Sequence, residues 1–120
     1  MRVGIDLIEI GRFGNIAKDD IKLNTIFTPK EIDYCRRFVD LNLHLSGTFA
    51  VKEAVAKAFK TGFDGEILPL DIEVIRTADG IPQVKLYRQA KKFFEGNGFR
   101  EIEISISHSK TDACAICLIN

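Results

Sequence analysis

Apolar and polar residues alternate near both ends of the chain, and this pattern constrains the fold more than any other feature of the sequence. Successive side chains of a strand point to opposite sides, so the alternation indicates strands. The two rows of the first strand are Val3, Ile5 and Leu7 on one side and Gly4, Asp6 and Ile8 on the other. The second alternating segment sets Ile102, Ile104 and Ile106 against Glu103, Ser105 and Ser107. We therefore expect strands at both ends, with Asp6 on the face opposite the main apolar row of its strand.

Helix signals lie between these strands. Thr28 can cap a helix that Pro29 begins, and Glu31 completes a capping box, so a helix is expected to run to about Val39. A second helix is expected to begin near Ser46 or Thr48 and to stop before Gly62. The other expected elements are a helical stretch at 12–17, strands at 71–76 and 82–86 around a turn at Asp79-Gly80, a helix at 87–95, and a strand at 113–119. This order predicts an α+β fold with a mainly antiparallel sheet and packed helices.

The length of 120 residues indicates one domain, spanning 1–120. The 17 basic side chains balance the 17 acidic ones, whereas nucleic-acid binders usually carry a basic excess, so no nucleic-acid partner is expected. An acid at position 6 falls where a signal peptide needs its apolar run, and no apolar run approaches the roughly 18 residues of a membrane span. We therefore expect no membrane association.

The three cysteines are an odd number, and two of them, Cys114 and Cys117, lie close together. Their spacing would suit half of a metal site, but there is no second pair. An offset of three puts their side chains on opposite faces of a strand, and we interpret them as buried small apolar residues. The cysteine content thus predicts a reduced, cytoplasmic protein.

Acidic residues at two places could carry chemistry. Asp6, with Glu9 beyond it, lies near Gly4, where a ligand or metal could approach, although a solvated acid at a strand end fits the pattern too. Glu53 and Lys57 are four residues apart and share one face of a helix. That spacing fits an ordinary surface ion pair. It also fits a site in which Asp6 and Glu53 hold Mg²⁺ and Lys57 meets a phosphate.

Hydroxyl groups and an imidazole gather where the strand at 102–108 meets its loop. Ser105, Ser107, His108 and Ser109 could form hydrogen bonds to phosphate or sugar oxygens, and they could equally well form a capped hairpin turn. Neighbours on a strand face apart, so a serine beside a histidine is not by itself a nucleophile with its base. The other histidine, His44, lies among apolar residues and is interpreted as structural.

Three segments carry a family resemblance by their order and their residues. They are Gly4-Ile5-Asp6-Leu7-Ile8-Glu9, Phe49-Ala50-Val51-Lys52-Glu53-Ala54 with Lys57-Ala58-Phe59, and Ile104-Ser105-Ile106-Ser107-His108-Ser109. Together with Thr61-Gly62, Gly80-x-Pro82 and the helix start at Thr28, they resemble the signature segments of holo-acyl-carrier-protein synthases. These enzymes are small, single-domain phosphopantetheinyl transferases, and the resemblance covers essentially the whole chain.

The resemblance implies a fold, a reaction and a set of site residues. The fold would be phosphopantetheinyl-transferase-like, and the protein a homotrimer with its active site between neighbouring subunits. Phosphopantetheine would move from coenzyme A to a serine of apo acyl carrier protein, and adenosine bisphosphate would leave. Asp6 and Glu53 would bind Mg²⁺, Lys57 would lie beside the transferred phosphate, and Arg12 would face the acidic carrier. The nucleotide portion would contact Thr61, Gly62, Gly80, Pro82, His108 and Ser109.

The chain departs from the family in two places. Many members carry arginine where this chain has Thr48, a position that usually belongs to the nucleotide-binding surface. Several also carry extra arginines in the stretch that here contains Ile21, Lys22 and Thr25 beside Asp19 and Asp20. The first departure predicts that coenzyme A binds more weakly or through other residues. The second predicts a less basic docking surface for the carrier.

Two other functional classes fit parts of the sequence. A non-catalytic relative that binds coenzyme A or a carrier would agree with the two departures, but it need not have kept all of Asp6, Glu53, Lys57 and His108. A magnesium-dependent hydrolase of nucleotide diphosphates would use the same acids with water as the nucleophile. It would release adenosine bisphosphate without a carrier.

Overall fold

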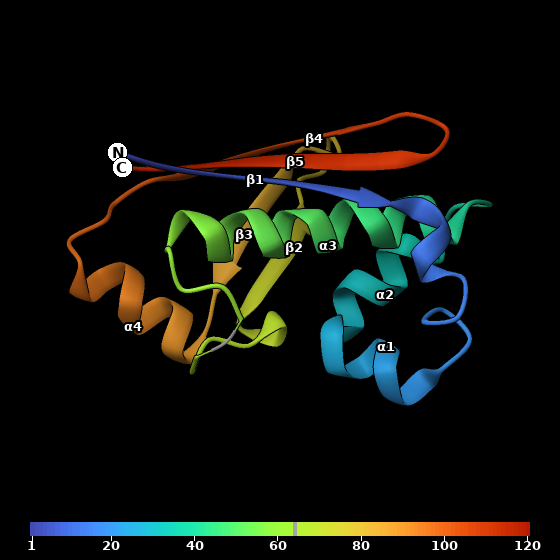
Figure 1. Cartoon of the computed structure of the whole chain (residues 1–120), viewed down its shortest axis with the longest axis horizontal. Helices are drawn as coiled ribbons and strands as arrows, with labels where there is room; N and C mark the ends of the chain where they lie inside the picture. Colours follow the sequence, from blue (N-terminus) through green and yellow to red (C-terminus); the bar gives the residue numbers. More distant parts are fainter. Residues whose placement is uncertain (64) are drawn as a thin grey trace.

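The two ends of the chain form one antiparallel sheet in the computed structural model, which describes residues 1–63 and 65–120 (Figure 1). The sheet contains β1 (Arg2–Glu9), β5 (Asp112–Ile119) and β4 (Ile102–His108) in the order β1-β5-β4. Asp6 is opposite Ala115, which in turn is opposite Ile106, so this register runs across all three strands. The predicted strands and the α+β class are confirmed, and the two termini lie side by side (Figure 1).

The long helix α3 (Leu41–Ala58) packs under this sheet and forms the centre of the core (Figure 1). Its contact with β1 depends on Gly4. A Cβ atom added to Gly4 would overlap the carbonyl group of Ala54 and lie 2.6 Å from the amide nitrogen of Ala58. Only a residue without a side chain lets the strand come so close to the helix backbone.

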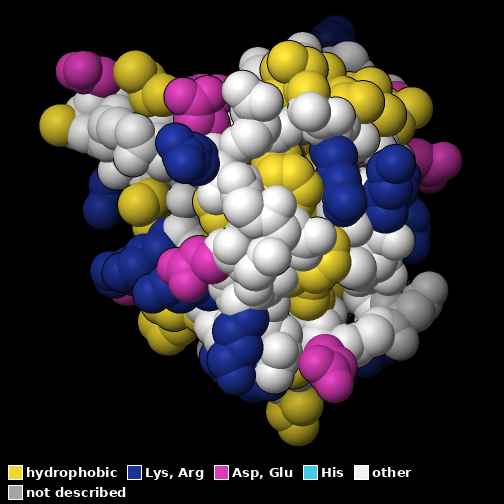
Figure 2. All heavy atoms as spheres, turned by 90° about the vertical axis from the view of Figure 1, so that its left-hand side faces the viewer, with side chains coloured by type: hydrophobic (Ala, Val, Ile, Leu, Met, Phe, Trp, Pro, Cys, Tyr) yellow, Lys and Arg dark blue, Asp and Glu magenta, His cyan; other side chains and the backbone are white. Residues whose placement is uncertain are grey.

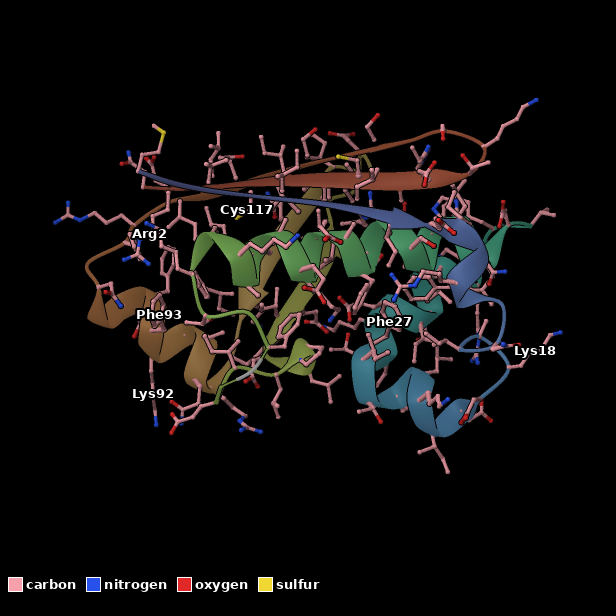
Figure 3. The ribbon with its side chains drawn as sticks, viewed as in Figure 1. Arg2, Lys18, Phe27, Lys92, Phe93 and Cys117 are labelled. Atoms are coloured by element: carbon pink, nitrogen blue, oxygen red, sulfur yellow. The ribbon has the colours of Figure 1, made fainter. Side chains whose placement is uncertain are left out.

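A second, two-stranded sheet packs beside the first. It consists of β2 (Ile72–Arg76) and β3 (Pro82–Leu86), joined by a turn in which Gly80 adopts φ +82°. The short helix η2 (Pro69–Asp71) precedes β2, and α4 (Arg88–Gly96) follows β3. Arg2 ties α4 to the main sheet, because its guanidinium lies 5.8 Å from the ring centre of Phe93 in α4 (Figure 3). The same guanidinium donates to the Phe59 carbonyl at 3.1 Å.

The helices at the other end are set by their caps. The predicted capping box is confirmed: Thr28 N–H donates to Glu31 Oε1 at 2.8 Å, and Glu31 N–H donates to Thr28 Oγ1 at 3.3 Å. The helix that it begins, α2 (Pro29–Cys35), ends four residues before the expected Val39. No helix of the described chain has the length and apolar character needed to cross a membrane.

Two helices begin at residues other than those predicted because aspartate side chains cap them there. The stretch expected to be helical at 12–17 contains only the 3-10 turn η1 (Ile10–Phe13), and the regular helix α1 (Asp20–Ile26) begins where the Asp19 carboxylate accepts from Ile21 N–H at 3.1 Å. Likewise, α3 begins at Leu41 rather than near Ser46 because Asp40 Oδ1 accepts from Leu43 N–H at 3.1 Å.

The main apolar row of β1 points away from α3 and stays exposed. Each member lies opposite a residue of β5, in the pairs Val3–Leu118, Ile5–Ile116 and Leu7–Cys114. These six residues form what we call the outer apolar face, and Val3, Ile5 and Leu7 are 59%, 58% and 69% exposed. Figure 2, viewed from the α4 end, shows hydrophobic side chains gathered at the top, where the sheet lies. Of the two neighbouring cysteines, Cys117 is buried as expected, while Cys114 lies half-buried on this face.

A buried ion pair joins α2, α3 and β2. Lys52 Nζ lies 2.8 Å from Glu31 Oε1, and both side chains are fully buried. Lys52 also donates to the carbonyls of Pro69 and Ile72 at 2.9 and 2.7 Å, and Val74 N–H donates to Glu31 at 2.8 Å. Burial raises the pKa of Glu31 and lowers that of Lys52, and their mutual attraction opposes both shifts.

Candidate active site

Asp6 and Lys57 meet where β1 crosses α3. Lys57 Nζ lies 2.9 Å from Asp6 Oδ1 and donates to the Ile5 carbonyl at 3.1 Å. The Asp6 side chain is 14% exposed and that of Lys57 is 52% exposed, so the pair opens to solvent at the edge of the sheet. The close approach at Gly4, two residues earlier on the same face of β1, brings Asp6 within reach of the helix.

Glu53 adds a second carboxylate to this part of α3. It lies one helical turn before Lys57, and residues four apart share a helix face. No group of three or more His, Cys, Asp or Glu side chains able to hold a metal occurs in the described chain. Two carboxylates suit Mg²⁺, which keeps several waters and takes other ligands from substrate phosphates. The structure thus brings Asp6 to Lys57 and has Glu53 one turn earlier on the same helix, and a Mg²⁺ site at these two carboxylates stays a prediction.

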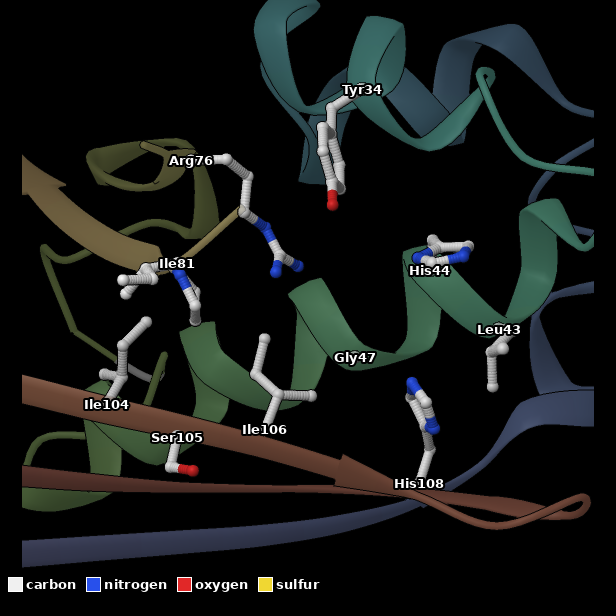
Figure 4. Close-up of a pocket in the computed structure, with 11 residues that line it drawn as sticks. Tyr34, Leu43, His44, Gly47, Arg76, Ile81, Ile104, Ser105, Ile106 and His108 are labelled. Carbon is white, nitrogen blue, oxygen red and sulfur yellow. The ribbon is translucent and has the colours of Figure 1, made fainter. Parts of the chain in front are cut away.

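His108 lies on the other edge of the sheet and lines a pocket of about 330 Å³ (Figure 4). Four elements build its walls: α2, α3, the β2–β3 hairpin and β4. Its polar lining residues include Tyr34, His44, Arg76, Ser105 and His108, and no acidic residue lines it within the described chain. The pocket thus has the size and polarity to take part of an anionic ligand rather than a metal ion.

His44 is a pocket residue that the sequence did not reveal as one. Its ring stacks on Phe38 with 3.7 Å between ring centres. Burial lowers its pKa, and the positive charges of Arg76 and His108 lower it further. Tyr34 and Arg76 were missed as well. No periodic pattern marks these residues, because segments distant in sequence bring them together.

The other expected nucleotide-contacting residues fall into separate places. Pro82 lines the pocket with His108, while Gly80 borders an adjoining hollow that shares Tyr34 and Arg76 with it. The Ser109 hydroxyl accepts from the N–H groups of Thr111 at 3.3 Å and Asp112 at 3.2 Å, so it serves the hairpin turn.

Thr61 and Gly62 follow the C-terminal end of α3, far along the helix from the pocket. The backbone turns there through two left-handed residues, Lys60 at φ +63° and Gly62 at φ +57°. Thr61 lines a hollow beside α4. Arg12 is exposed in the last turn of η1.

The acid–lysine group and the pocket lie at opposite edges of the main sheet. β1 carries Asp6, β4 carries His108, and β5 lies between them, which separates the edge strands by about 10 Å. The lining of the pocket includes neither Asp6, Glu53 nor Lys57. Asp6 and Lys57 are therefore separate from the His108 pocket within one chain.

Thr48 does not reach the pocket surface. It is 2% exposed, its hydroxyl donates to the His44 carbonyl at 2.9 Å, and the sulfur of Cys35 lies 3.8 Å away. On α3 the pocket is lined by Leu43, His44 and Gly47, so this helix offers it no lysine or arginine.

Comparison with known proteins gives a consistent result over nearly the whole chain. A family model described as the 4'-phosphopantetheinyl transferase superfamily matches residues 2–117. The holo-[acyl-carrier-protein] synthase of Caldicellulosiruptor saccharolyticus is 44% identical, over 95% of this chain and 93% of its own length. That of Clostridium botulinum (strain Eklund 17B / Type B) is also 44% identical, over 98% and 94%.

Solved structures give the same picture. The Helicobacter pylori holo-[acyl-carrier-protein] synthase in complex with coenzyme A is similar with a TM-score of 0.85 and 29% identity, covering 98% of this chain and 99% of that one. The Bacillus anthracis holo-(acyl-carrier-protein) synthase in complex with CoA (3',5'-ADP) has a TM-score of 0.79 and 31% identity, with coverages of 98% and 94%.

Proposed function

The chain belongs to the 4'-phosphopantetheinyl transferase superfamily, and from this premise we propose that it is a holo-acyl-carrier-protein synthase. It transfers phosphopantetheine from coenzyme A to a serine of apo acyl carrier protein and releases adenosine 3',5'-bisphosphate. The observation that carries this proposal is the placement of Asp6 and Lys57 at the crossing of β1 and α3, with Glu53 one turn away. Family membership alone would leave open whether the catalytic groups are in place.

The chemistry of the transfer needs positioned charges more than covalent steps by the protein. The serine oxygen bonds to the phosphorus nearer pantetheine, the bond from that phosphorus to the bisphosphate oxygen breaks, and the serine proton leaves. Asp6 and Glu53 would hold Mg²⁺, which when bound neutralises the diphosphate oxygens. Lys57 offsets the charge that grows on the leaving group. Asp6 orients the Lys57 ammonium through the 2.9 Å contact.

The nucleotide portion of coenzyme A is assigned to the residues that the resemblance names. His108 and Pro82 line one pocket, and Gly80 borders the adjoining hollow. Thr61 and Gly62 follow α3 beyond Lys57, and Ser109 lies in the turn after His108. A ligand as long as coenzyme A can reach more than one of these places, because its nucleotide and its pantetheine arm lie on opposite sides of the diphosphate.

A homotrimer with the active site between subunits accounts for two features of the chain. The outer apolar face leaves Val3, Ile5 and Leu7 more than half exposed, which is costly for a lone chain in water. Asp6 and the His108 pocket lie at opposite edges of the main sheet, so a neighbouring subunit could bring its pocket to the Asp6 side. Exposed Arg12 is available to the acidic carrier.

A reducing, cytoplasmic location agrees with the thiol chemistry. Cys35, Cys114 and Cys117 are all free and form no disulfide. Reduced thiols are typical of the compartment in which coenzyme A and acyl carrier proteins meet.

Intact-mass spectrometry of an apo acyl carrier protein tests the function directly. The carrier is incubated with this protein, coenzyme A and Mg²⁺, and we expect a mass gain of one phosphopantetheine group. Omission of the metal, or an Asp6→Asn variant, should abolish the gain. A protein that binds coenzyme A but modifies no carrier would be a non-catalytic relative. Release of adenosine bisphosphate without any carrier would identify a hydrolase.

A Glu53→Gln variant tests the metal assignment separately. Loss of one of two carboxylate ligands should raise the Mg²⁺ concentration needed for half-maximal activity at least tenfold, or abolish turnover. An unchanged magnesium dependence would remove Glu53 from the metal site. Circular dichroism of the variant checks that the fold is intact.

A further inference from the structure

The pocket that His108 lines carries positive charge without an acid to balance it. Arg76, His44 and His108 are its basic side chains, and the described lining contains no aspartate or glutamate. Arg76 comes from the end of β2, and Figure 4 shows its guanidinium pointing into the hollow, between Tyr34 and Ile106. Arginine stays charged at all physiological pH values, so this pocket holds one permanent cation.

Arg76 is held in place but not neutralised. Its guanidinium carbon lies 4.7 Å from the ring centre of Tyr34, a cation–π contact. Its Nη1 lies 3.4 Å from the Gly80 carbonyl, which is longer than a strong hydrogen bond. The ion pairs found within the described chain do not include it. A pre-oriented guanidinium with unused donors is suited to binding a phosphate through two parallel hydrogen bonds.

The rest of the pocket fits the sugar and base beside such a phosphate. Leu43, Ile104 and Pro82 give it apolar walls, and its 330 Å³ would hold part of a nucleotide but not a whole coenzyme A molecule. The lowered pKa of His44, to which Arg76 and His108 both contribute, agrees with a positive potential here.

We propose that Arg76 binds the 3'-phosphate of coenzyme A and thereby sets the preference of this enzyme for coenzyme A over 3'-dephospho-coenzyme A. The inference rests on the proposed function, which assigns the diphosphate to Asp6, Glu53 and Lys57. The 3'-phosphate is then the one phosphate left for the nucleotide pocket. Because α3 offers the pocket no lysine or arginine and Thr48 is buried, the recognising charge comes from β2.

Steady-state kinetics with the two donors test the proposal. We compare kcat/KM for coenzyme A and 3'-dephospho-coenzyme A in the wild type, Arg76→Gln and Arg76→Lys, with an apo carrier as acceptor. Loss of a charge-assisted phosphate contact should lower kcat/KM for coenzyme A by about tenfold to a hundredfold. The kcat/KM for 3'-dephospho-coenzyme A should change less than about twofold, because this donor lacks the 3'-phosphate that Arg76 binds. Arg76→Lys keeps the charge and should retain part of the preference.

Arg36→Gln is the matched control. Arg36 is an exposed arginine at the end of α2, and it lines neither this pocket nor the adjoining hollow. This substitution should leave the ratio of the kcat/KM values for the two donors unchanged. If Arg76→Gln lowers kcat/KM by the same factor for coenzyme A and for 3'-dephospho-coenzyme A, so that the ratio of the two values is unchanged, the proposal is overturned.

Calorimetry separates this proposal from the proposed function. Wild-type protein should bind adenosine 3',5'-bisphosphate at least tenfold more tightly than adenosine 5'-phosphate, and Arg76→Gln should remove most of that difference. If neither donor supports transfer, the proposed function fails, while the calorimetric difference still decides the role of Arg76. Equal loss of affinity for both nucleotides in Arg76→Gln would overturn it.

Discussion

At the scale of single residues, the contact between Gly4 and α3 controls how Asp6 is presented. Gly4 places β1 against the backbone of Ala54 and Ala58, and the next inward-facing residue, Asp6, then reaches Lys57. The order of effects is packing first and electrostatics second, because the ion pair exists only if the strand lies this close. Asp6 therefore depends on a neighbour that has no side chain.

Gly4→Ala should therefore harm both stability and turnover. The added methyl group meets helix backbone, which cannot rotate away, so we expect a loss of about 1–3 kcal/mol or more in the free energy of unfolding. Urea denaturation of Gly4→Ala and of the control Gly65→Ala measures this, since a Cβ on Gly65 would meet nothing within 4 Å. Equal stability of the two variants would show that β1 can move off the helix at little cost.

Lys57→Ala should slow the transfer itself. Removal of a charge that stabilises the leaving group should lower kcat by about a hundredfold while KM changes little. The control is Lys91→Ala, which removes an exposed lysine of α4. An effect confined to KM would make Lys57 a ground-state contact.

The lowered pKa of His44 predicts a pH dependence of stability. Burial, Arg76 and His108 all disfavour the charged imidazole in the folded state, and only the Asp40 carboxylate favours it. The unfolded chain takes up this proton near pH 6.5, before the folded chain does, so stability is lost as the pH falls below that value.

Unfolding free energies of wild type and His44→Gln at several pH values between 5 and 8 check this sign. The variant loses the Phe38 stack at every pH, which gives a constant offset. On top of that offset, the wild type should lose more stability than the variant as the pH falls. Parallel curves would show that His44 does not titrate differently on folding.

At the scale of secondary-structure elements, the Glu31–Lys52 pair fixes how α2, α3 and β2 meet. Lys52→Met leaves the buried Glu31 carboxylate without its cation, which typically costs about 3–5 kcal/mol. Lys60→Met is the matched control, because Lys60 is exposed just beyond the same helix. Thermal and urea unfolding should show a large loss for the first variant and a change near zero for the second. Comparable small changes would contradict a stabilising role for the pair.

Local signals predicted the elements, and distant contacts decided what they build. The Thr28 capping box and the strand Pro82–Leu86 were predicted to the residue because their signals are local. The starts of α1 and α3 were missed although Asp19 and Asp40 were visible as possible caps. Asp6, Glu53 and Lys57 could be named from the sequence as a possible site. Arg76 and His44 could not be, because only the packing of the hairpin against α3 and β4 makes them neighbours.

At the scale of the whole molecule, the reactivity of the cysteine thiols can show whether the outer apolar face is covered by other subunits. Burial raises the pKa of Cys35 to about 11 and that of Cys117 to about 12, so neither thiol should react with a thiol reagent at pH 8 in the folded protein. Cys114, half-buried on the outer apolar face, should react in a separate subunit. In a trimer that covers this face it should be protected.

Thiol titration combined with light scattering tests this. We expect a trimer with no reactive thiol in the wild type, and an Ile5→Lys variant that dissociates and exposes one thiol per chain. Full unfolding should release all three. A fully active monomer with a reactive Cys114 would remove the trimer from the proposed function.

The pairing of β1 with β5 also sets when the enzyme can come into being during synthesis. β1 is made before every other element described here, whereas β5, the strand between β1 and β4, is made after all of them. A nascent chain can form α3 and the β2–β3 hairpin early, but Asp6, the metal ligand that we propose, lies on an unpaired strand until β5 has been made. A chain whose synthesis stops before residue 112 therefore lacks the strand that pairs with both β1 and β4, and its apolar β1 strand has unpaired edges that favour association with other chains.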